Sequence, residues 1–387
     1  MAPRQGILTT GTQSTEGRAV RDVSPKIHQL EPNKYPLVVL MTNVEGRLSD
    51  ADNYKVESYE DELLPKFDVL GSTALTAGAT SMIVTNYLYF VKNQLVRIAN
   101  GETVRVNATP TTTTVSITRA VGETAAAAAD AGAKLQIIGS AFEEASDTGV
   151  ILSTTKTNPF NYLQIFKNAV GWSGSAKSYK VYGEDDKAYD RAKAIIEHCK
   201  DIELSCLLGE RYTAIGPDGQ RLSTMRGVFK FISSVNVDAG GEFTEAEMEE
   251  WMRLSFRYGS EKKVGILSSK LISVINGFGR DKIRTKSGES TYGISMKEYT
   301  NSGYDLDLLR HPLLENASLT DLTGLQGMGM ILDINDLSMK KAPGRYMMHS
   351  YNLQTPGNDS EKEDILSECC IMLNSEKKHG KVFGVQE

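Results

Sequence analysis

The longest regular pattern of apolar and polar positions lies between Asp185 and Gly209. Small or apolar residues recur there at steps of four and three, which places them on one face of an α-helix. These positions are Ala188, Ala192, Ile195, Cys199, Ile202 and Cys206. Asp185 and Asp186 suit a helix N-terminus, and Gly209 can end a helix in the left-handed conformation. The pattern predicts a helix over 185–208 whose apolar stripe is core and packs on a sheet or on another subunit.

Before this helix, residues 36–66 have the character of extended chain. From Tyr54 to Tyr59 two sets of side chains alternate with the period of a strand, and both sets include polar residues. Three consecutive carboxylates follow at Glu60, Asp61 and Glu62. They could form a solvated face or one half of a salt-bridge set between subunits. A metal site ranks last, because neither a histidine nor a second acidic cluster is nearby in the sequence.

Residues 67–145 are rich in Thr, Ala and Gly and contain few charges. Five short apolar runs occur at 81–85, 94–99, 102–107, 113–119 and 134–139, and Asn100-Gly101 between two of them is typical of a tight hairpin turn. Short strands with regular turns predict a small β-barrel or sandwich domain.

The sequence after the helix contains segments with the apolar spacing of helices and segments with the apolar spacing of strands. Thr244 with Glu247 forms a capping box, which predicts a helix through Met248 and Trp251. Strand-like runs recur from about residue 262 to the C-terminus. We therefore expect residues 210–387 to form a mixed α+β body.

The composition of the chain argues against several classes of function. The chain has 387 residues, a formal net charge of −6 and a pI of about 5.6, which argues against a general basic surface for nucleic acid. No apolar run approaches the length of a membrane span, so we expect no membrane partner. The four cysteines, which include no C-x-x-C pair, predict a reducing compartment without a disulfide framework.

No constellation of catalytic residues emerges. The sequence lacks the common metalloprotease, phosphate-binding, nucleophile-elbow and dinucleotide motifs, and its five histidines lie in five different contexts. Asp305-x-Asp307 and Asp333-x-x-Asp336 match metal-ligand spacing only weakly. We therefore predict no catalytic residue, no cofactor and no metal, which is the profile of a structural protein.

At this point the order and spacing of short segments resemble a tailed-phage major capsid protein of the HK-ninety-seven-type fold, in the branch with an inserted β-domain. The segments are Glu60-Asp61-Glu62-Leu63 near Pro65, Gly101-Glu102 with Thr118-Arg119, Gln164-Ile165-Phe166 with Ser173-Gly174, Tyr182-Gly183, Asp201-Ile202-Glu203 with Leu207-Leu208-Gly209, Leu332-Asp333 with Leu337, and His379-Gly380. One departure is Ala120-Val121-Gly122-Glu123, where such proteins often have a Gly-rich turn.

The resemblance implies an α+β coat-protein fold. It implies an N-terminal arm (1–40), extended-loop strands (41–66 and 146–165), an inserted β-barrel-like domain (67–145), a peripheral domain with the spine helix (166–224), an axial domain (225–327) and a return to the peripheral domain (328–387).

The implied function is self-assembly, as hexamers and pentamers, into the icosahedral shell that encloses the dsDNA genome of a tailed bacteriophage. Portal, scaffold or decoration proteins would be further partners, and the packaged DNA would be faced without tight binding. The protein would be part of the virion and would be assembled in the host cytoplasm. Candidate contacts between subunits are Tyr54, Lys55, Glu57, Tyr59, Glu60, Asp61 and Glu62.

Two alternatives remain at this stage. The first is a shell protein of a cellular nanocompartment, which would share the fold. The second is a soluble enzyme or glycan-binding protein that uses residues 67–145 as its binding module.

Overall fold

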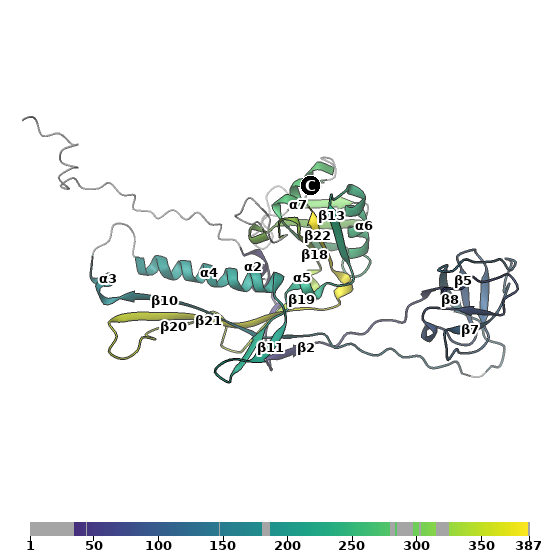
Figure 1. The fold of residues 1–387 in the computed structure, drawn as a ribbon, viewed down its shortest axis with the longest axis horizontal. Coiled ribbons are helices and arrows are strands. Elements are labelled where there is room, and N and C mark those ends of the chain that lie inside the picture. Colours follow the sequence, from purple (N-terminus) through teal and green to yellow (C-terminus); the bar gives the residue numbers. More distant parts are fainter. Residues whose placement is uncertain are drawn as a thin grey trace, which may run out of the picture. The chain divides into compact units, whose positions relative to one another are not determined.

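The computed structural model describes residues 35–43, 45–146, 148–179, 186–278, 283–284, 297–301, 303–314 and 325–385. The fold is mixed α+β with strands dominant, as predicted (Figure 1). The chain divides into two compact units: a larger one formed by Met1–Ser58 with Pro159–Glu387, and a smaller one formed by Tyr59–Asn158. The smaller unit is therefore wider than the predicted insert of 67–145.

The smaller unit is a six-stranded antiparallel sheet in the order β3-β8-β5-β6-β7-β4. The strands are β3 (Phe67–Val69), β4 (Ser81–Ile83), β5 (Gln94–Ile98), β6 (Thr103–Val106), β7 (Thr114–Thr118) and β8 (Lys134–Ser140). The five predicted runs correspond to β4 to β8. A bridge between Leu70 and Val84 links the two edge strands, so hydrogen bonds surround a core that includes Val96, Val104 and Val115.

A buried ion pair fixes the loop that departs from the expected Gly-rich turn. Glu102 is fully buried, and Arg119 donates to both of its carboxylate oxygens at 2.7 and 2.5 Å. The N–H groups of Ala120 and Ala127 donate to the same carboxylate. Arg119 holds the pKa of Glu102 below its ordinary value against the opposing effect of burial. The buried ion pair thus orders this loop.

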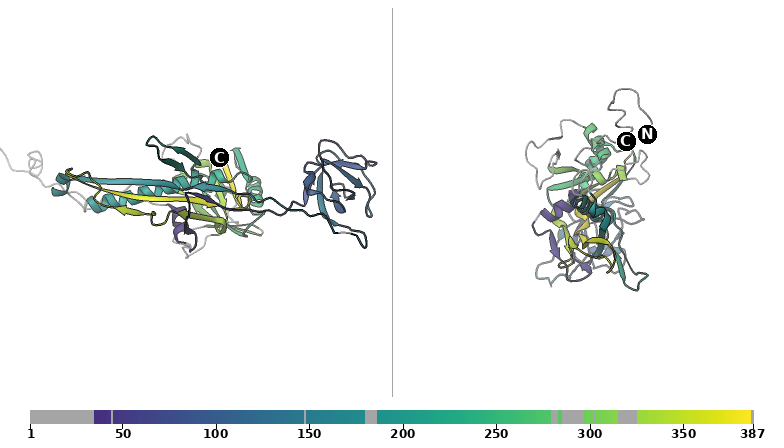
Figure 2. Two further views of the ribbon diagram at one scale, coloured as in Figure 1. Left: turned by 90° about the horizontal axis from the view of Figure 1, so that it is seen from below. Right: turned by 90° about the vertical axis from the view of Figure 1, so that its left-hand side faces the viewer.

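The larger unit contains two sheets. The first has the order β1-β19-β21-β10, with β20 also paired to β21. Its strands are β1 (Leu48–Asp50), β10 (Gln164–Ser173), β19 (Leu337–Lys341), β20 (Met348–Ser350) and β21 (Ser360–Leu373). The long helix α4 (Asp186–Leu208) lies along the β10–β21 ladder in the views of Figures 1 and 2.

The second sheet is seven-stranded, in the order β13-β22-β18-β14-β17-β16-β15. Its strands are β13 (Asn236–Gly241), β14 (Lys262–Leu267), β15 (Ile283–Arg284), β16 (Lys297–Asn301), β17 (Tyr304–Arg310), β18 (Gly329–Leu332) and β22 (Gly380–Val385). Helices α6 (Glu245–Ser255) and α7 (Ser269–Phe278) pack on one face, and both arms of the predicted capping box at Thr244 are formed. Val264 and Ile266 of β14 enter the core on the opposite face, so the central strands are buried on both sides.

The expected return of residues 328–387 to the first sheet is wrong in two places. β19, β20 and β21 do join β10, but β18 and β22 pair within the second sheet. The last strand, β22, therefore pairs in parallel with β13, although the paired residues are more than 140 positions apart in the sequence. Apolar runs this short are compatible with either sheet, and only tertiary pairing decides between them.

The expectation of an arm to residue 40 and extended chain from 36 is also wrong where the structure can test it, because Pro36–Asn43 form helix α2. Residues 1–34 of the predicted arm lie outside the described residues. Leu37, Leu40 and Met41 are buried in the main core. The N–H groups of Leu37 and Val38 donate to the two carboxylate oxygens of Glu203, each at 2.7 Å. A buried carboxylate from α4 thus caps α2.

The predicted stripe of α4 is correct only in its C-terminal half. Cys199, Ile202 and Cys206 are buried, whereas Ala188 and Ala192 are exposed and Ile195 keeps 38% of its surface accessible. Asp185 lies outside the described residues. In the N-terminal half, the side turned to the sheet instead carries Ala194 and His198 together with charged residues, which are described with the assembly surfaces below.

Gly209 ends α4 for a reason other than the left-handed conformation. A Cβ at Gly209 would lie 2.5 Å from the Ser205 carbonyl oxygen and 2.7 Å from that of Met225. Gly227 faces it, and a Cβ there would lie 2.5 Å from the Gly209 nitrogen. The Gly227 N–H donates to the Gly209 carbonyl at 2.8 Å. Two backbones therefore touch directly where α4 ends.

We expect Gly227→Ala to lower the free energy of unfolding by about 2–3 kcal/mol, because the added methyl group would overlap backbone atoms that cannot rotate away. Urea titration of the purified chain measures this. Gly277→Ala is the matched control: its Cβ would meet no atom within 4 Å, so it should be neutral or stabilising by up to about 1 kcal/mol. Equal stability of the two variants would contradict the close contact.

Candidate assembly surfaces

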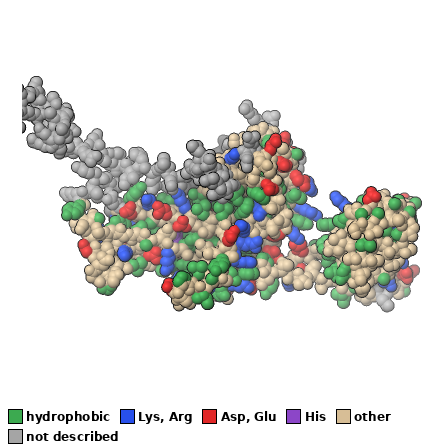
Figure 3. All heavy atoms as spheres, in the orientation of Figure 1, with side chains coloured by type: hydrophobic (Ala, Val, Ile, Leu, Met, Phe, Trp, Pro, Cys, Tyr) green, Lys and Arg blue, Asp and Glu red, His purple; other side chains and the backbone are tan. Residues whose placement is uncertain are grey.

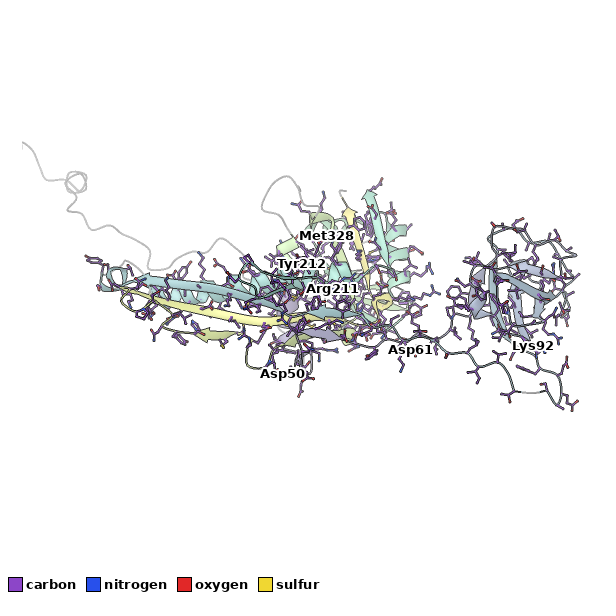
Figure 4. The ribbon with its side chains drawn as sticks, turned by 60° about the horizontal axis from the view of Figure 1, so that its bottom comes forward. Asp50, Asp61, Lys92, Arg211, Tyr212 and Met328 are labelled. Carbon is purple, nitrogen blue, oxygen red and sulfur yellow. The ribbon has the colours of Figure 1, made fainter. Side chains whose placement is uncertain are left out.

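The predicted contact residues are divided between the two units. β2 (Lys55–Glu57) pairs antiparallel with β9 (Phe160–Tyr162), and a bridge joins Glu60 to Thr157. Tyr54 stacks on Tyr162 with ring centroids 5.9 Å apart. Tyr59 is 77% exposed, and Asp61 is exposed while accepting a hydrogen bond from Thr154 at 2.6 Å (Figure 4).

Two charged residues among these predicted contacts interact with side chains of their own subunit. Lys55 forms an ion pair with Glu57 and lies over the Phe160 ring, 4.3 Å from its centroid. Glu62 is exposed. The ladder therefore brings Tyr54, Lys55 and Glu57 together, whereas Tyr59 to Glu62 belong to the smaller unit.

A hairpin that the sequence analysis did not single out exposes apolar side chains. β11 (Tyr212–Ile215) pairs with β12 (Arg221–Thr224), and Pro217-Asp218-Gly219 forms the turn between them. Tyr212, Ile215 and Leu222 are 57%, 78% and 49% exposed. The turn signal was visible in the sequence, but exposure of apolar strand residues cannot be inferred from alternation alone.

A basic cluster lies where this hairpin leaves the body of the larger unit. It consists of Arg211 just before β11, Arg226 and Lys230 before and within α5 (Val228–Phe231), and Lys381 in β22. Figure 3 shows Lys and Arg side chains gathered near α5, and Figure 4 places Arg211 beside Tyr212. Sequence reasoning missed the cluster because its members are up to 170 residues apart.

Backbone carbonyls and aromatic rings hold these cations. Arg211 donates to the Phe160 carbonyl at 2.8 Å and lies 3.8 Å from the centroid of that ring. Arg226 donates to the Lys230 carbonyl at 3.0 Å. Lys381 donates to the Phe229 carbonyl at 3.1 Å. Burial, and then the neighbouring cations, lower the pKa of Arg226 and of Lys381.

The N-terminal half of α4 is attached to the first sheet by charges. Arg191 donates to both carboxylate oxygens of Glu363, whose side chain is fully buried. Lys187 and Lys177 both pair with Glu361 and hold its pKa down to about 2. These contacts replace the apolar stripe that the sequence led us to expect.

Three further hydrogen bonds strengthen the attachment. The Trp172 indole donates to Asp190 at 2.8 Å. His198 lies between Asn168 at 2.6 Å and Ser367 at 2.8 Å, and burial lowers its pKa. The helix is thereby fixed in rotation and in register on β10 and β21.

The described part of the chain contains no group of three or more His, Cys, Asp or Glu side chains arranged to hold a metal ion. Asp333 instead caps a turn and accepts hydrogen bonds from Ser260, and Asp307 pairs with Lys262. Across the same described ranges, no helix combines the length and apolar character needed to cross a membrane.

Comparison with known proteins decides the identity. A family of major capsid proteins, described as SU10 major capsid protein, matches residues 6–386. The chain belongs to this family. It is 22% identical over 360 residues to the major capsid protein of Pseudomonas phage PaMx41, which covers 89% of this chain and 84% of that protein.

Solved structures agree in fold. The chain resembles the capsid of an empty GTA particle with a TM-score of 0.50 and 8% identity, over 98% of this chain and all of that one. The capsid of the native GTA particle gives the same TM-score, identity and coverage. The chain is thus a major capsid protein of a phage and not an enzyme, and it is part of the virion.

We expect Arg191→Ala to lower the midpoint of thermal unfolding of the unassembled capsid subunit by several degrees, because it leaves the buried Glu363 carboxylate without its guanidinium. Differential scanning calorimetry measures the shift.

Lys193→Ala on the same helix is the control. It removes an exposed ion pair with Glu197 and should move the midpoint by no more than about 1 °C. A midpoint for Arg191→Ala equal to that of the control would show that α4 is held by something other than this pair.

Proposed function

We propose that this capsid protein assembles, as hexamers and pentamers, into a closed icosahedral shell around the dsDNA genome of a tailed phage, in the cytoplasm of the host. The observation that carries the proposal is the family match over residues 6–386 together with a capsid fold over 98% of the chain. The acidic balance supports it, because an interior that bound DNA tightly would hinder its movement during packaging and ejection.

Domain roles belong to the same proposal. The first sheet with α4 would form the peripheral domain, and the second sheet with α6 and α7 the axial domain that meets its copies around the symmetry axes. The β2–β9 ladder would be the base of the extended loop, with the smaller unit as an inserted barrel. Portal, scaffold or decoration proteins would bind the assembled shell.

Assembly would rest on several moderate interfaces, each burying on the order of 1,000 Å² or more. Weak individual contacts allow misplaced subunits to leave, and a closed shell makes the sum hard to reverse. Tyr54, Lys55 and Glu57 on the ladder would contribute to one such interface, and the exposed apolar side chains of the β11–β12 hairpin to another. Tyr59 of the smaller unit would be a further contact residue.

Electron microscopy of the purified protein, expressed with and without the remaining head genes, tests the proposal. Closed shells that hold DNA when the packaging proteins are present are expected. Shells that enclose an enzyme cargo would favour the nanocompartment instead. A soluble monomer that binds glycans saturably would refute both shell functions.

The hairpin gives a sharper prediction. Tyr212→Ser combined with Leu222→Ser should leave the subunit folded, since exposed substitutions usually change stability by less than about 0.5 kcal/mol. The yield of closed shells should fall severalfold, as measured by sedimentation and negative-stain counting. Gln220→Ser near the tip of the same hairpin should preserve the yield. Normal shells from the double variant would remove the hairpin from the interface.

A further inference from the structure

The basic cluster of Arg211, Arg226, Lys230 and Lys381 contains more positive charges than there are carboxylates beside it. Two carboxylates lie nearby, Glu210 and Glu376, and both are engaged. Glu210 pairs with Lys230 at 2.6 Å. Glu376 accepts hydrogen bonds from the N–H of Ser233 and from the hydroxyl groups of Ser233 and Ser234. Four cations thus face two carboxylates.

Three members of the cluster have no carboxylate partner within the described residues. Arg211, Arg226 and Lys381 donate only to carbonyl oxygens and lie over the rings of Phe160, Phe231 and Phe229. Like charges held together repel one another, and in a partly buried site water screens the repulsion incompletely. The arrangement therefore costs stability in the free subunit, and an incoming anion would relieve that cost.

The geometry favours carboxylates over a nucleic-acid backbone. The cluster is compact, and its arginines present the forked donors that suit carboxylates as well as phosphates. The rings of Phe160 and Phe229 already lie against Arg211 and Lys381, and they hold these cations in place without neutralising them. The chain as a whole is acidic, so a copy of itself supplies carboxylates wherever it docks.

One stretch of this chain has the matching chemistry. Glu60, Asp61 and Glu62 are three consecutive carboxylates, and Tyr59 and Leu63 on either side are 77% and 94% exposed. When subunits join head to tail in a ring, each interface pairs two different patches of the same chain. One chain then carries both halves of a complementary pair.

We propose that the basic cluster of one subunit binds the acidic segment 60–62 of a second copy of this chain. The proposal rests on the self-assembly described above and names the two surfaces that meet. The carboxylates would engage Arg211, Arg226 and Lys381.

A charge-swap experiment tests the pairing. Reversing the cluster with Arg211→Glu and Lys381→Glu, or the segment with Glu60→Lys, Asp61→Lys and Glu62→Lys, should each raise the subunit concentration needed for shell assembly about tenfold or more. Combining both reversals in one chain should restore assembly. Light scattering and electron microscopy measure the extent of assembly. Assembly of the wild-type protein should weaken as the salt concentration rises.

The controls separate charge from fold. Lys193→Glu with Arg253→Glu makes the same change in net charge at exposed positions and should assemble normally. Thermal unfolding of unassembled subunits reports the fold. If the reversed cluster fails to fold, Arg211→Gln with Lys381→Gln replaces it and should weaken assembly in the same direction.

Three outcomes would overturn the pairing: normal assembly of both single-surface variants, a swap that restores nothing, or normal shells that package less DNA, which would assign the cluster to nucleic acid. All three require that the wild-type protein forms shells. Absence of wild-type shells would instead refute the proposed function, so the two failures are distinguishable.

Discussion

The carboxylate of Glu203 is the contact on which the architecture of the larger unit depends. It is fully buried, accepts the first free N–H groups of α2 through both oxygens, and lies 2.6 Å from Nε2 of the buried His311. One side chain of α4 therefore joins the long helix, the N-terminal helix and the end of β17. A charge without partners could not remain in such a core, so the three elements are placed by the need to satisfy it.

The same logic explains which parts of the fold could be predicted from sequence. The existence of α4, the capping box at Thr244 and the strands of the smaller unit follow from local periodicity, and the structure contains all of them. The N-terminal face of α4 could not be predicted, since Lys187 and Arg191 resemble solvated residues until Glu361 and Glu363, about 170 positions away, are placed opposite them. Helix α2 could likewise not be predicted, because its cap comes from Glu203 rather than from a neighbour in sequence.

The assembly surfaces divide in a similar way. The acidic segment 60–62 is continuous, so its charge is visible in the sequence itself. The basic cluster is assembled from four separate positions and exists only once β22 has returned to the second sheet beside α5. The return of β22 to that sheet, rather than to the first one, thus determines both the topology and the electrostatic character of the face that Lys381 shares with Arg226.

The contact between Gly209 and Gly227 also constrains how the sequence can change. A steric conflict in an ordinary core can be relieved by a smaller residue on the opposite side, and cores accumulate such paired changes. Here both partners already lack a side chain, so no smaller residue is available to either. The end of the long helix is therefore a point at which variation at one position cannot be compensated at the other, and the surrounding residues must vary around a fixed pair.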